Sequence, residues 1–387
     1  MSNSVHSDTK NTMRVGARRF EMSPFHDCYA NAETVMGVYA GRYYPVYNGE
    51  DVEETYWALR RKAALYDVPE RPVEISGPDV DGFLEHVFAR RVANMKTGRG
   101  RYAIALTPDG GVFMDGILFK LDEGRYWYVQ PDGALETWLA AHKGGFDVTV
   151  SDPHAWVLQI QGPTSLEVMK AASDGAIDED MGYFRSGYFD LGGQRQYVSR
   201  TGWTSERGYE IYFQGDASDA ARLWAHLLEK GAPHGLVFSS ISSMDIRRIE
   251  AAILDNGTDF DMTMTPYEAG LGAFVDMDKG AFVGRDALEG AATGTRLFGV
   301  KSTAGDPAYR GQVFEDGATV GHVTAAAHSP YLEAGIGYVR FDAVGDWAGK
   351  SLTMEADGGG TVACEIVELP FYDKEKRIPR GLDTAVP

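Results

Sequence analysis

The side chains that could perform acid–base, nucleophilic or metal chemistry do not fall into a recognised catalytic spacing. The nine histidines include no H-x-H or H-E-x-x-H pattern, so a metal site has no support. There is no G-x-S-x-G elbow, no G-x-x-x-x-G-K-[ST] loop, and no G-x-G-x-x-G motif after a strand. Two carboxylates in strand-like runs remain, Asp115 in GGVFMDG and Glu210 in GYEIY. On the residues alone, Asp115 is typical of a hairpin end and Glu210 of a solvent-facing strand position.

The elements that must position these carboxylates form an internal repeat. ISGPDVDGFLEHVF begins at Ile75 and IQGPTSLEVMKAA at Ile160, and each predicts a strand, a Gly-Pro turn and an amphipathic helix. Each copy is followed by three strand-like runs and a second helix, at 101–106, 111–121, 125–130 and 134–142 in the first copy and at 186–191, 195–203, 208–213 and 219–231 in the second. The matching order favours an α+β fold with duplicated ferredoxin-like units, although a chance recurrence of Gly-Pro turns is the alternative.

The pattern changes after the second unit. Short strands separated by Gly and Asp turns begin near Arg296 and predict a small β-barrel. The segment 243–260 predicts a helix that ends at Asn256-Gly257. We therefore expect a flexible N-terminal tail over residues 1–20, a two-unit region over residues 21–290 with repeats starting near 75 and 160, and a C-terminal β-barrel domain over residues 295–387.

Composition limits the classes of function. The 387 residues carry a net charge of −19, which argues against a nucleic-acid partner, because phosphate contacts need a concentrated basic surface. No run of 18 apolar residues and no signal-like N-terminus occurs, so we expect no membrane association and a cytoplasmic location. The two cysteines, Cys28 and Cys364, form no C-x-x-C motif, which fits a reducing compartment.

A series of landmarks between about Met22 and Phe371 resembles the T-protein (aminomethyltransferase) superfamily of folate-dependent enzymes. The landmarks are ALYDV (64–68), VEISGPD (73–79), GGVFMDGILFKL (110–121), IQGPTSLEVM (160–169), SRTGWTSERGYEIYF (199–213), RRIEAAILDNGTDFDMTMTPYEAGLGAFV (247–275), KGAFVGRDAL (279–288), HSPYLEAGIGYV (328–339) and ELPFY (368–372). Within the superfamily, the stretch around Trp203 looks most like the dimethylsulfoniopropionate demethylase form.

The resemblance implies roles for both carboxylates. Asp115 matches the family's key carboxylate, which sits beside the reacting nitrogen of the folate; Met114 stands where the family commonly has a second acid. Glu210 matches the glutamate that grips the pterin, and a carboxylate can accept two adjacent N–H donors of the pterin edge at once. The region 21–290 is accordingly expected to bind tetrahydrofolate.

Other residues are implied to line the same site. Trp203 and Tyr102 are expected to stack on the folate or to shape the donor pocket. Arg248 is expected to meet the glutamate tail of folate, with ordinary pairing to acids of its own helix as the alternative. Candidate walls of the donor pocket, or alternatively core residues, are Tyr39, Tyr43 and Tyr44.

Two departures from the family concern the donor. Met244 stands where glycine-cleavage proteins carry a ligand-contacting arginine, which argues against aminomethyl transfer. The segment Pro69-Glu70-Arg71 replaces the Ser-His-Met of the glycine-cleavage form and is one residue shorter than usual before the next strand. Since this segment borders the donor pocket in the family, we expect a different donor.

The resemblance therefore implies a tetrahydrofolate-dependent methyltransferase, or demethylase, that moves a methyl group from a small methylated donor to N5 of tetrahydrofolate. A sulfonium such as dimethylsulfoniopropionate leaves as a neutral thioether and needs no proton, which matches the lack of a clear acid in the sequence. The alternatives are an O- or N-demethylase of an aromatic ether or methylated amine, a glycine-cleavage-type aminomethyltransferase, and a folate-binding accessory protein. The expected partner is a small-molecule donor, and a homodimer is left open.

Overall fold

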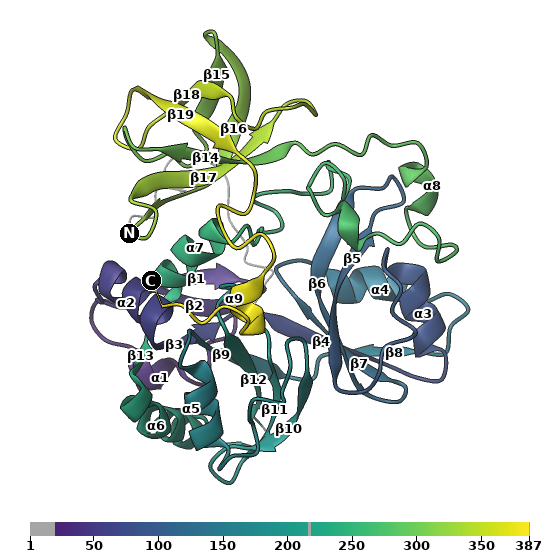
Figure 1. Cartoon of the computed structure of the whole chain (residues 1–387). Helices are drawn as coiled ribbons and strands as arrows, with labels where there is room; N and C mark the ends of the chain where they lie inside the picture. The colour runs from purple at the N-terminus through teal and green to yellow at the C-terminus, as the bar shows by residue number, and fades with distance from the viewer. Residues whose placement is uncertain (1–19, 216–217, 387) are drawn as a thin grey trace, which may run out of the picture.

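The computed structural model describes residues 20–215 and 218–386, which form two β-sheets with helices on their outer faces and a separate closed barrel (Figure 1). The barrel lies at the top of Figure 1, above the two sheets. The expected N-terminal tail lies, apart from Phe20, outside the described residues.

The first sheet has five strands in the order β5-β6-β7-β4-β8. Its elements along the chain are β4 (Arg71–Ser76), α3 (Val80–Val87), β5 (Arg99–Leu106), β6 (Val112–Asp122), β7 (Arg125–Gln130), α4 (Leu135–His142) and β8 (Thr149–Ser151). Helices α3 and α4 cover one face of this sheet, because Phe83 and Leu139 pack in one core with Leu118 and Tyr128 of the strands.

The second sheet has six strands in the order β10-β11-β12-β9-β3-β13. Its elements are β3 (Ala63–Val68), β9 (Ala155–Gln161), α5 (Ser165–Ala172), β10 (Ser186–Asp190), β11 (Arg195–Ser199), β12 (Gly208–Gln214), α6 (Ala220–Gly231), η3 (Ala232–His234) and β13 (Leu236–Phe238). The order β10-β11-β12-β9 repeats the order β5-β6-β7-β4, which confirms the predicted duplication. The units differ because β3 is inserted between β9 and β13.

The two sheets pack against each other through their inner faces. Phe119 and Trp127 of the first sheet share a buried core with Tyr66, Tyr197 and Tyr212 of the second. Strand residues alternate between faces, so every second residue of β6 and β12 points into the space between the sheets.

The remaining elements enclose this space. The C-terminal barrel closes in the order β14-β17-β16-β15-β18-β19, as predicted. Its strands are β14 (Leu297–Ser302), β15 (Gln312–Glu315), β16 (Ala318–Ser329), β17 (Ala334–Phe341), β18 (Ser351–Glu355) and β19 (Thr361–Val367). The other elements are α1 (His26–Tyr29), the hairpin β1 (Val35–Tyr39) and β2 (Arg42–Tyr47), α2 (Val52–Arg61), α7 (Ile241–Glu250), η4 (Gly272–Phe274), α8 (Arg285–Leu288) and α9 (Arg377–Arg380).

Helix α7 ends at Glu250, so the predicted end at Asn256-Gly257 is wrong. The hydroxyl of Tyr338, on barrel strand β17, lies 2.9 Å from the carbonyl oxygen of Arg248 and 3.0 Å from that of Ile249. Both carbonyl groups also accept backbone N–H groups of the following turn, so Tyr338 adds a further donor at the end of the helix. The chain then turns at Ala252, which has a positive φ of 55°, and Asn256 is free to serve a loop.

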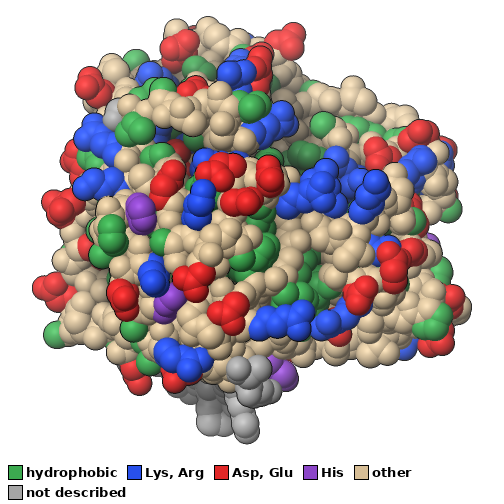
Figure 2. Space-filling model, turned by 60° about the horizontal axis from the view of Figure 1, so that its bottom comes forward, with side chains coloured by type: hydrophobic (Ala, Val, Ile, Leu, Met, Phe, Trp, Pro, Cys, Tyr) green, Lys and Arg blue, Asp and Glu red, His purple; other side chains and the backbone are tan. Residues whose placement is uncertain are grey.

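The surface carries both kinds of charge. Figure 2 shows Lys and Arg side chains gathered in clusters on one face among acidic ones, although the net charge is −19. No helix in the described part of the chain is both long and apolar enough to cross a membrane.

Candidate functional site

Asp115 lies in the interior of strand β6, on the face that looks toward the second sheet. Ile117 and Phe119 share this face and pack into the core between the sheets. The hairpin turn before the strand is closed without Asp115, because the amide N–H of Gly110 donates to the carbonyl oxygen of Thr107 at 2.9 Å. Asp115 is therefore not a turn-closing residue.

Two side chains donate hydrogen bonds to Asp115. The hydroxyl of Tyr102, on β5, lies 2.8 Å from Oδ2, and Nδ2 of Asn256 lies 3.1 Å from Oδ1. Burial raises the pKa of Asp115 to about 6, although both donors oppose the rise. Burial and the charge of Asp115 in turn raise the pKa of the Tyr102 hydroxyl well above its ordinary value. A carboxyl group with such a pKa can bind or release a proton near neutral pH.

Gly111 permits the loop that carries Asn256 to approach this strand. A Cβ atom at Gly111 would lie 1.9 Å from the carbonyl oxygen of Met262, so only glycine fits here. Next to it, the amide N–H of Val112 donates to the carbonyl oxygen of Met264 at 2.9 Å. The Gly-Gly of the GGVFMDG motif thus serves both the turn and the close approach of the loop.

The hairpin β1–β2 brings tyrosines to the same region. The hydroxyl of Tyr39 donates to Oδ1 of Asp255 at 3.0 Å, and its ring lies edge-to-face with Tyr44 at 6.5 Å. Burial and then the charge of Asp255 raise the pKa of Tyr39, and the charge of Asp115 adds to the rise. Tyr43, however, pairs with Val38 in the register and lies on the opposite face, where its ring contacts Phe20. The structure thus brings Tyr39 and Tyr44 together near Asp115 but not Tyr43.

Glu210 is the centre of a second polar cluster on the facing sheet. Its side chain is only 5% exposed, so it is not a solvent-facing strand residue. It accepts hydrogen bonds from Thr201 Oγ1 at 2.7 Å, the Tyr212 hydroxyl at 2.6 Å, Ser199 Oγ at 3.3 Å and Gln159 Nε2 at 3.3 Å. Burial nevertheless raises the pKa of Glu210.

Strand alternation accounts for the orientation of Glu210. Its neighbours Tyr209 and Ile211 pack in the helix-covered core, whereas Tyr212 packs between the sheets. Asp115 and Glu210 therefore lie on the facing inner surfaces of the two sheets.

Trp203 and Arg248 lie at the edge of the Glu210 cluster. The amide N–H of Trp203 donates to Oε1 of Gln159 at 3.3 Å, and the guanidinium of Arg248 lies 5.1 Å from the centre of the Trp203 ring. Arg248 pairs with Asp245 at 2.6 Å and with the buried Asp259 at 2.8 Å. The pair with Asp245 is the same-helix alternative to a ligand role, and the pair with Asp259 was not predicted. A folate carboxylate would compete with both of these acids for Arg248.

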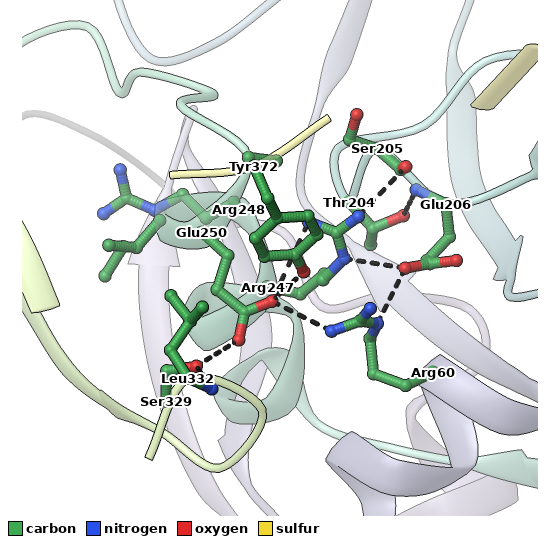
Figure 3. Close-up of polar contacts among 12 residues, drawn as sticks. Arg60, Thr204, Ser205, Glu206, Arg247, Arg248, Glu250, Ser329, Leu332 and Tyr372 are labelled. Carbon is green, nitrogen blue, oxygen red and sulfur yellow. Dashed lines mark hydrogen bonds and ion pairs between the residues drawn. The ribbon is translucent and has the colours of Figure 1, made fainter. Parts of the chain in front are cut away.

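The neighbouring Arg247 belongs to a separate buried network (Figure 3). Its guanidinium pairs with Glu206 at 2.7 Å, and that carboxylate also pairs with Arg60 at 2.9 Å. Glu250 pairs with Arg60 at 3.2 Å and accepts a hydrogen bond from Ser329 of β16 at 2.6 Å. Because all four charged residues are paired with one another, this network serves the architecture rather than a ligand.

Several residues of the site have no signal in the sequence. Asn256 and Gln159 bind the two carboxylates, and Asp255 binds Tyr39, from segments far away along the chain. Only the register shows that Gln159 lies directly opposite Glu210 across β9 and β12. Gln159 could therefore be predicted only from the pairing register of β9 and β12.

Comparisons with known proteins agree with this architecture. The GCVT N-terminal domain family matches residues 25–279, and the glycine cleavage T-protein C-terminal barrel domain family matches residues 296–373. The chain is 33% identical over 360 residues to an aminomethyltransferase of Streptomyces avermitilis, covering 88% of this chain and 94% of the relative. It is 34% identical over 355 residues to an aminomethyltransferase of Cutibacterium acnes, covering 87% and 94%.

A solved structure shares the fold. The crystal structure of glycine cleavage system aminomethyltransferase T from Bartonella henselae superposes with a TM-score of 0.80 at 24% identity and covers 92% of this chain and 99% of that one. The duplicated sheets, the barrel and two family matches that together span most of the sequence lead to one conclusion. The chain belongs to the glycine-cleavage T-protein family, the aminomethyltransferases.

Proposed function

We propose that this protein transfers a one-carbon unit from a small, positively charged donor to N5 of tetrahydrofolate, and that the donor group is an aminomethyl group. The observation that carries the proposal is Asp115, a carboxyl group with a pKa of about 6 on the inner face of the first sheet, held by Tyr102 and Asn256. Enzymes of the family use tetrahydrofolate as the one-carbon acceptor. The curated relatives cited above are named aminomethyltransferases, which supports the aminomethyl group as the donor.

The residues present suit a reduced pterin. Glu210 is a buried carboxylate on one inner face, and a carboxylate matches the adjacent N–H donors of a pterin edge. Asp115 lies on the other inner face, where it would lie beside the reacting nitrogen. Bound tetrahydrofolate would supply the nucleophilic nitrogen, and the protein would supply alignment, charge and a proton site.

Asp115 meets the main requirement of aminomethyl transfer, which is the movement of protons. A carboxyl group whose pKa lies near the working pH can change its protonation state during a reaction. The sequence alone showed no clear proton donor. It therefore favoured a sulfonium donor, because the thioether that leaves needs no proton. Burial of Asp115 removes that objection to the aminomethyl group.

The surroundings favour a donor with positive charge. Asp115 and Asp255 are both close to the ring of Tyr39, and burial together with the charges of Asp245, Asp255 and Glu70 raises the pKa of Tyr44. Aromatic faces attract cations by roughly 0.5–2 kcal/mol each, and nearby carboxylates add to this attraction. An aminomethyl ammonium and a methyl sulfonium share this charge.

A sulfonium donor is the second candidate, because of position 244. Met244 is fully buried in the core between the sheets, so this position offers no guanidinium to a ligand. Dimethylsulfoniopropionate, toward which the Trp203 motif leans, is therefore the second donor to test.

The deciding experiment offers tetrahydrofolate together with one donor at a time and identifies the folate product by mass spectrometry. The donors are an aminomethylated lipoyl carrier, dimethylsulfoniopropionate, a methylated amine and a methyl aryl ether. With the first donor we expect 5,10-methylenetetrahydrofolate, ammonia and the free dihydrolipoyl carrier, because the carbon loses its bonds to both the amine and the sulfur. Formation of 5-methyltetrahydrofolate from any other donor would replace the aminomethyl proposal. Asp115→Asn should slow turnover by about 100-fold or more, whereas Asp109→Asn, in the exposed turn of the same hairpin, should not.

The result that would overturn the proposal is also defined. Tight binding of tetrahydrofolate without turnover of any donor would indicate a folate-binding accessory protein. Equal turnover by wild type and Asp115→Asn would exclude the role given to this carboxyl group.

A further inference from the structure

Glu70 lies at the junction of the two sheets, between β3 of one sheet and β4 of the other. Its backbone is held by the buried side chain of Arg42, which is only 1% exposed. Nη1 of Arg42 donates to the carbonyl oxygen of Glu70 at 3.0 Å and to that of Ala155 at 2.8 Å. These two hydrogen bonds hold the backbone of the junction, so the backbone from which the Glu70 side chain extends is fixed.

The side chain of Glu70 lies beside Glu210. A single amide group, Nε2 of Gln159, is 3.3 Å from Oε1 of Glu70 and 3.3 Å from Oε1 of Glu210. Gln159 is fully buried, and its own Oε1 accepts the amide N–H of Trp203. The carboxyl groups of Glu70 and Glu210 thus share one donor, the side-chain amide of Gln159, which also contacts the backbone of Trp203.

One oxygen of Glu70 has nothing to bind. Oε2 is buried and has no hydrogen-bond partner among residues 20–215 and 218–386. Leaving a buried acceptor without a donor costs on the order of 1–3 kcal/mol, and more for a charged group. Burial, followed by the charge of Glu210, raises the pKa of Glu70 to about 8, and an N–H group bound at Oε2 would favour the ionised carboxylate. A ligand with a spare N–H group would remove this penalty.

The pterin edge has such a group. Its pyrimidine ring presents three N–H bonds on one side, one at N3 and two on the exocyclic 2-amino group. Oε2 of Glu210 already accepts three hydroxyl groups, so Oε1 is the oxygen of Glu210 that can accept an N–H of this edge, and a 2-amino hydrogen is left without an acceptor. The neighbouring carboxyl group is the natural acceptor for it.

We propose that Glu70 is a second pterin-binding carboxyl group, whose Oε2 accepts the 2-amino N–H that Glu210 leaves free. The inference rests on the proposed function, since it requires that reduced folate binds between the sheets. It assigns a binding role to the segment Pro69-Glu70-Arg71, which differs from the corresponding segment of the glycine-cleavage form. That segment would then select for the acceptor rather than for the donor.

The test compares two ligands by isothermal titration calorimetry. One is tetrahydrofolate, and the other is its analogue in which a methyl group replaces the 2-amino group. Glu70→Leu removes the acceptor and should weaken tetrahydrofolate binding about 10- to 100-fold while changing affinity for the analogue less than about threefold. Glu70→Gln retains an acceptor oxygen and should weaken tetrahydrofolate binding less than Glu70→Leu does.

Glu21→Gln is the matched control. Glu21 pairs with Nε of Arg42 at 3.6 Å, so this variant disturbs the anchor of the junction but leaves the carboxyl group of Glu70 in place. We expect it to bind both ligands as wild type does. If Glu70→Leu does not fold, Glu70→Gln measured with both ligands gives the answer, since only a direct contact makes its effect depend on the 2-amino group.

The possible failures are distinguishable. If wild-type protein binds tetrahydrofolate and neither Glu70 variant weakens it, the inference is wrong and the proposed function stands. An equal loss of affinity for both ligands would also overturn the inference, because it would indicate a general change of the pocket. If folded wild-type protein binds neither ligand, the proposed function itself fails.

Discussion

At the scale of single residues, the chemistry of this protein depends on burial. Asp115 is an ordinary aspartate in the sequence, and its pKa rises to about 6 because of burial and, to a smaller extent, the charge of Asp255. Tyr102 and Asn256 limit this rise by donating to its two oxygens. A residue that would be a permanent anion on the surface thereby becomes a group that can exchange a proton near neutral pH.

The raised pKa of Asp115 predicts a dependence of stability on pH. The pKa is about 6 in the folded protein and near its ordinary value of 3.8 in the unfolded chain. Protonation therefore stabilises the fold fully below about pH 3.8, and this contribution is lost as the pH rises through about 6. Relative to Asp115→Asn, the wild type should lose up to about 3 kcal/mol of unfolding free energy between pH 4 and pH 7.

Urea unfolding of both proteins at several pH values measures this difference. Met114→Leu is the control, because it changes the preceding buried residue and adds no ionisable group. The offset between wild type and Met114→Leu should not vary with pH. A wild-type–Asp115→Asn difference that is equally constant would contradict the raised pKa.

At the scale of elements, the early end of α7 creates much of the site. Because the helix stops at Glu250, the following residues form a loop that carries Asn256 to Asp115 and Asp255 to Tyr39. The same loop brings Asp259 to Arg248, and Asp259 also accepts a hydrogen bond from Thr324 of the barrel at 2.8 Å. The position of the loop therefore depends on Arg248.

Replacement of Arg248 should accordingly affect stability first. Arg248→Met leaves the fully buried carboxylate of Asp259 without its cation, which should cost about 3–5 kcal/mol in urea unfolding. Arg285→Met breaks the more exposed pair with Glu289 and should cost less than about 1 kcal/mol.

Ligand binding separates the two roles considered for Arg248. If Arg248 meets the glutamate tail, the folded variant should lose affinity for tetrahydrofolate but not for tetrahydropteroate, which lacks the tail. Equal changes for both compounds would assign Arg248 to the loop alone.

At the scale of the whole molecule, the network around Glu250 joins parts that are far apart in the chain. Glu250 on α7 contacts Arg60 of α2, Ser329 of the barrel and Tyr372 of the C-terminal segment (Figure 3). The Tyr56 hydroxyl also donates to it at 2.5 Å. This single carboxylate therefore connects helices α2 and α7 with the barrel and the C-terminal segment.

Neutralising Glu250 should loosen this connection. Glu250→Gln leaves Arg60 and Arg247 buried with only Glu206 as a counter-charge, and we expect a loss of about 3 kcal/mol in unfolding free energy. Limited proteolysis should also cut the C-terminal segment faster. Glu289→Gln, on an exposed helix end, should change stability by less than about 1 kcal/mol; comparable losses in the two variants would show that the network does not join the parts.

The strand and helix patterns predicted the fold class, and the resemblance to the T-protein family singled out the two candidate carboxylates. The repeated order of Gly-Pro turn, helix and strands predicts the duplicated sheets, because the periods of strands and helices are local properties. The motifs around Asp115 and Glu210 likewise lie within short segments. The strand patterns beyond Arg296 predict the barrel for the same reason.

Only the tertiary structure decided how these segments meet. It separated Tyr43 from Tyr39 and Tyr44, since the hairpin register places them on opposite faces. It ended α7 at Glu250, where the chain turns at Ala252 and a barrel tyrosine adds a hydrogen bond to the last carbonyl groups. It paired Arg248 with Asp259 and gave Asp115 its pKa of about 6. These outcomes depend on burial and on contacts between residues distant along the chain, which local patterns do not encode.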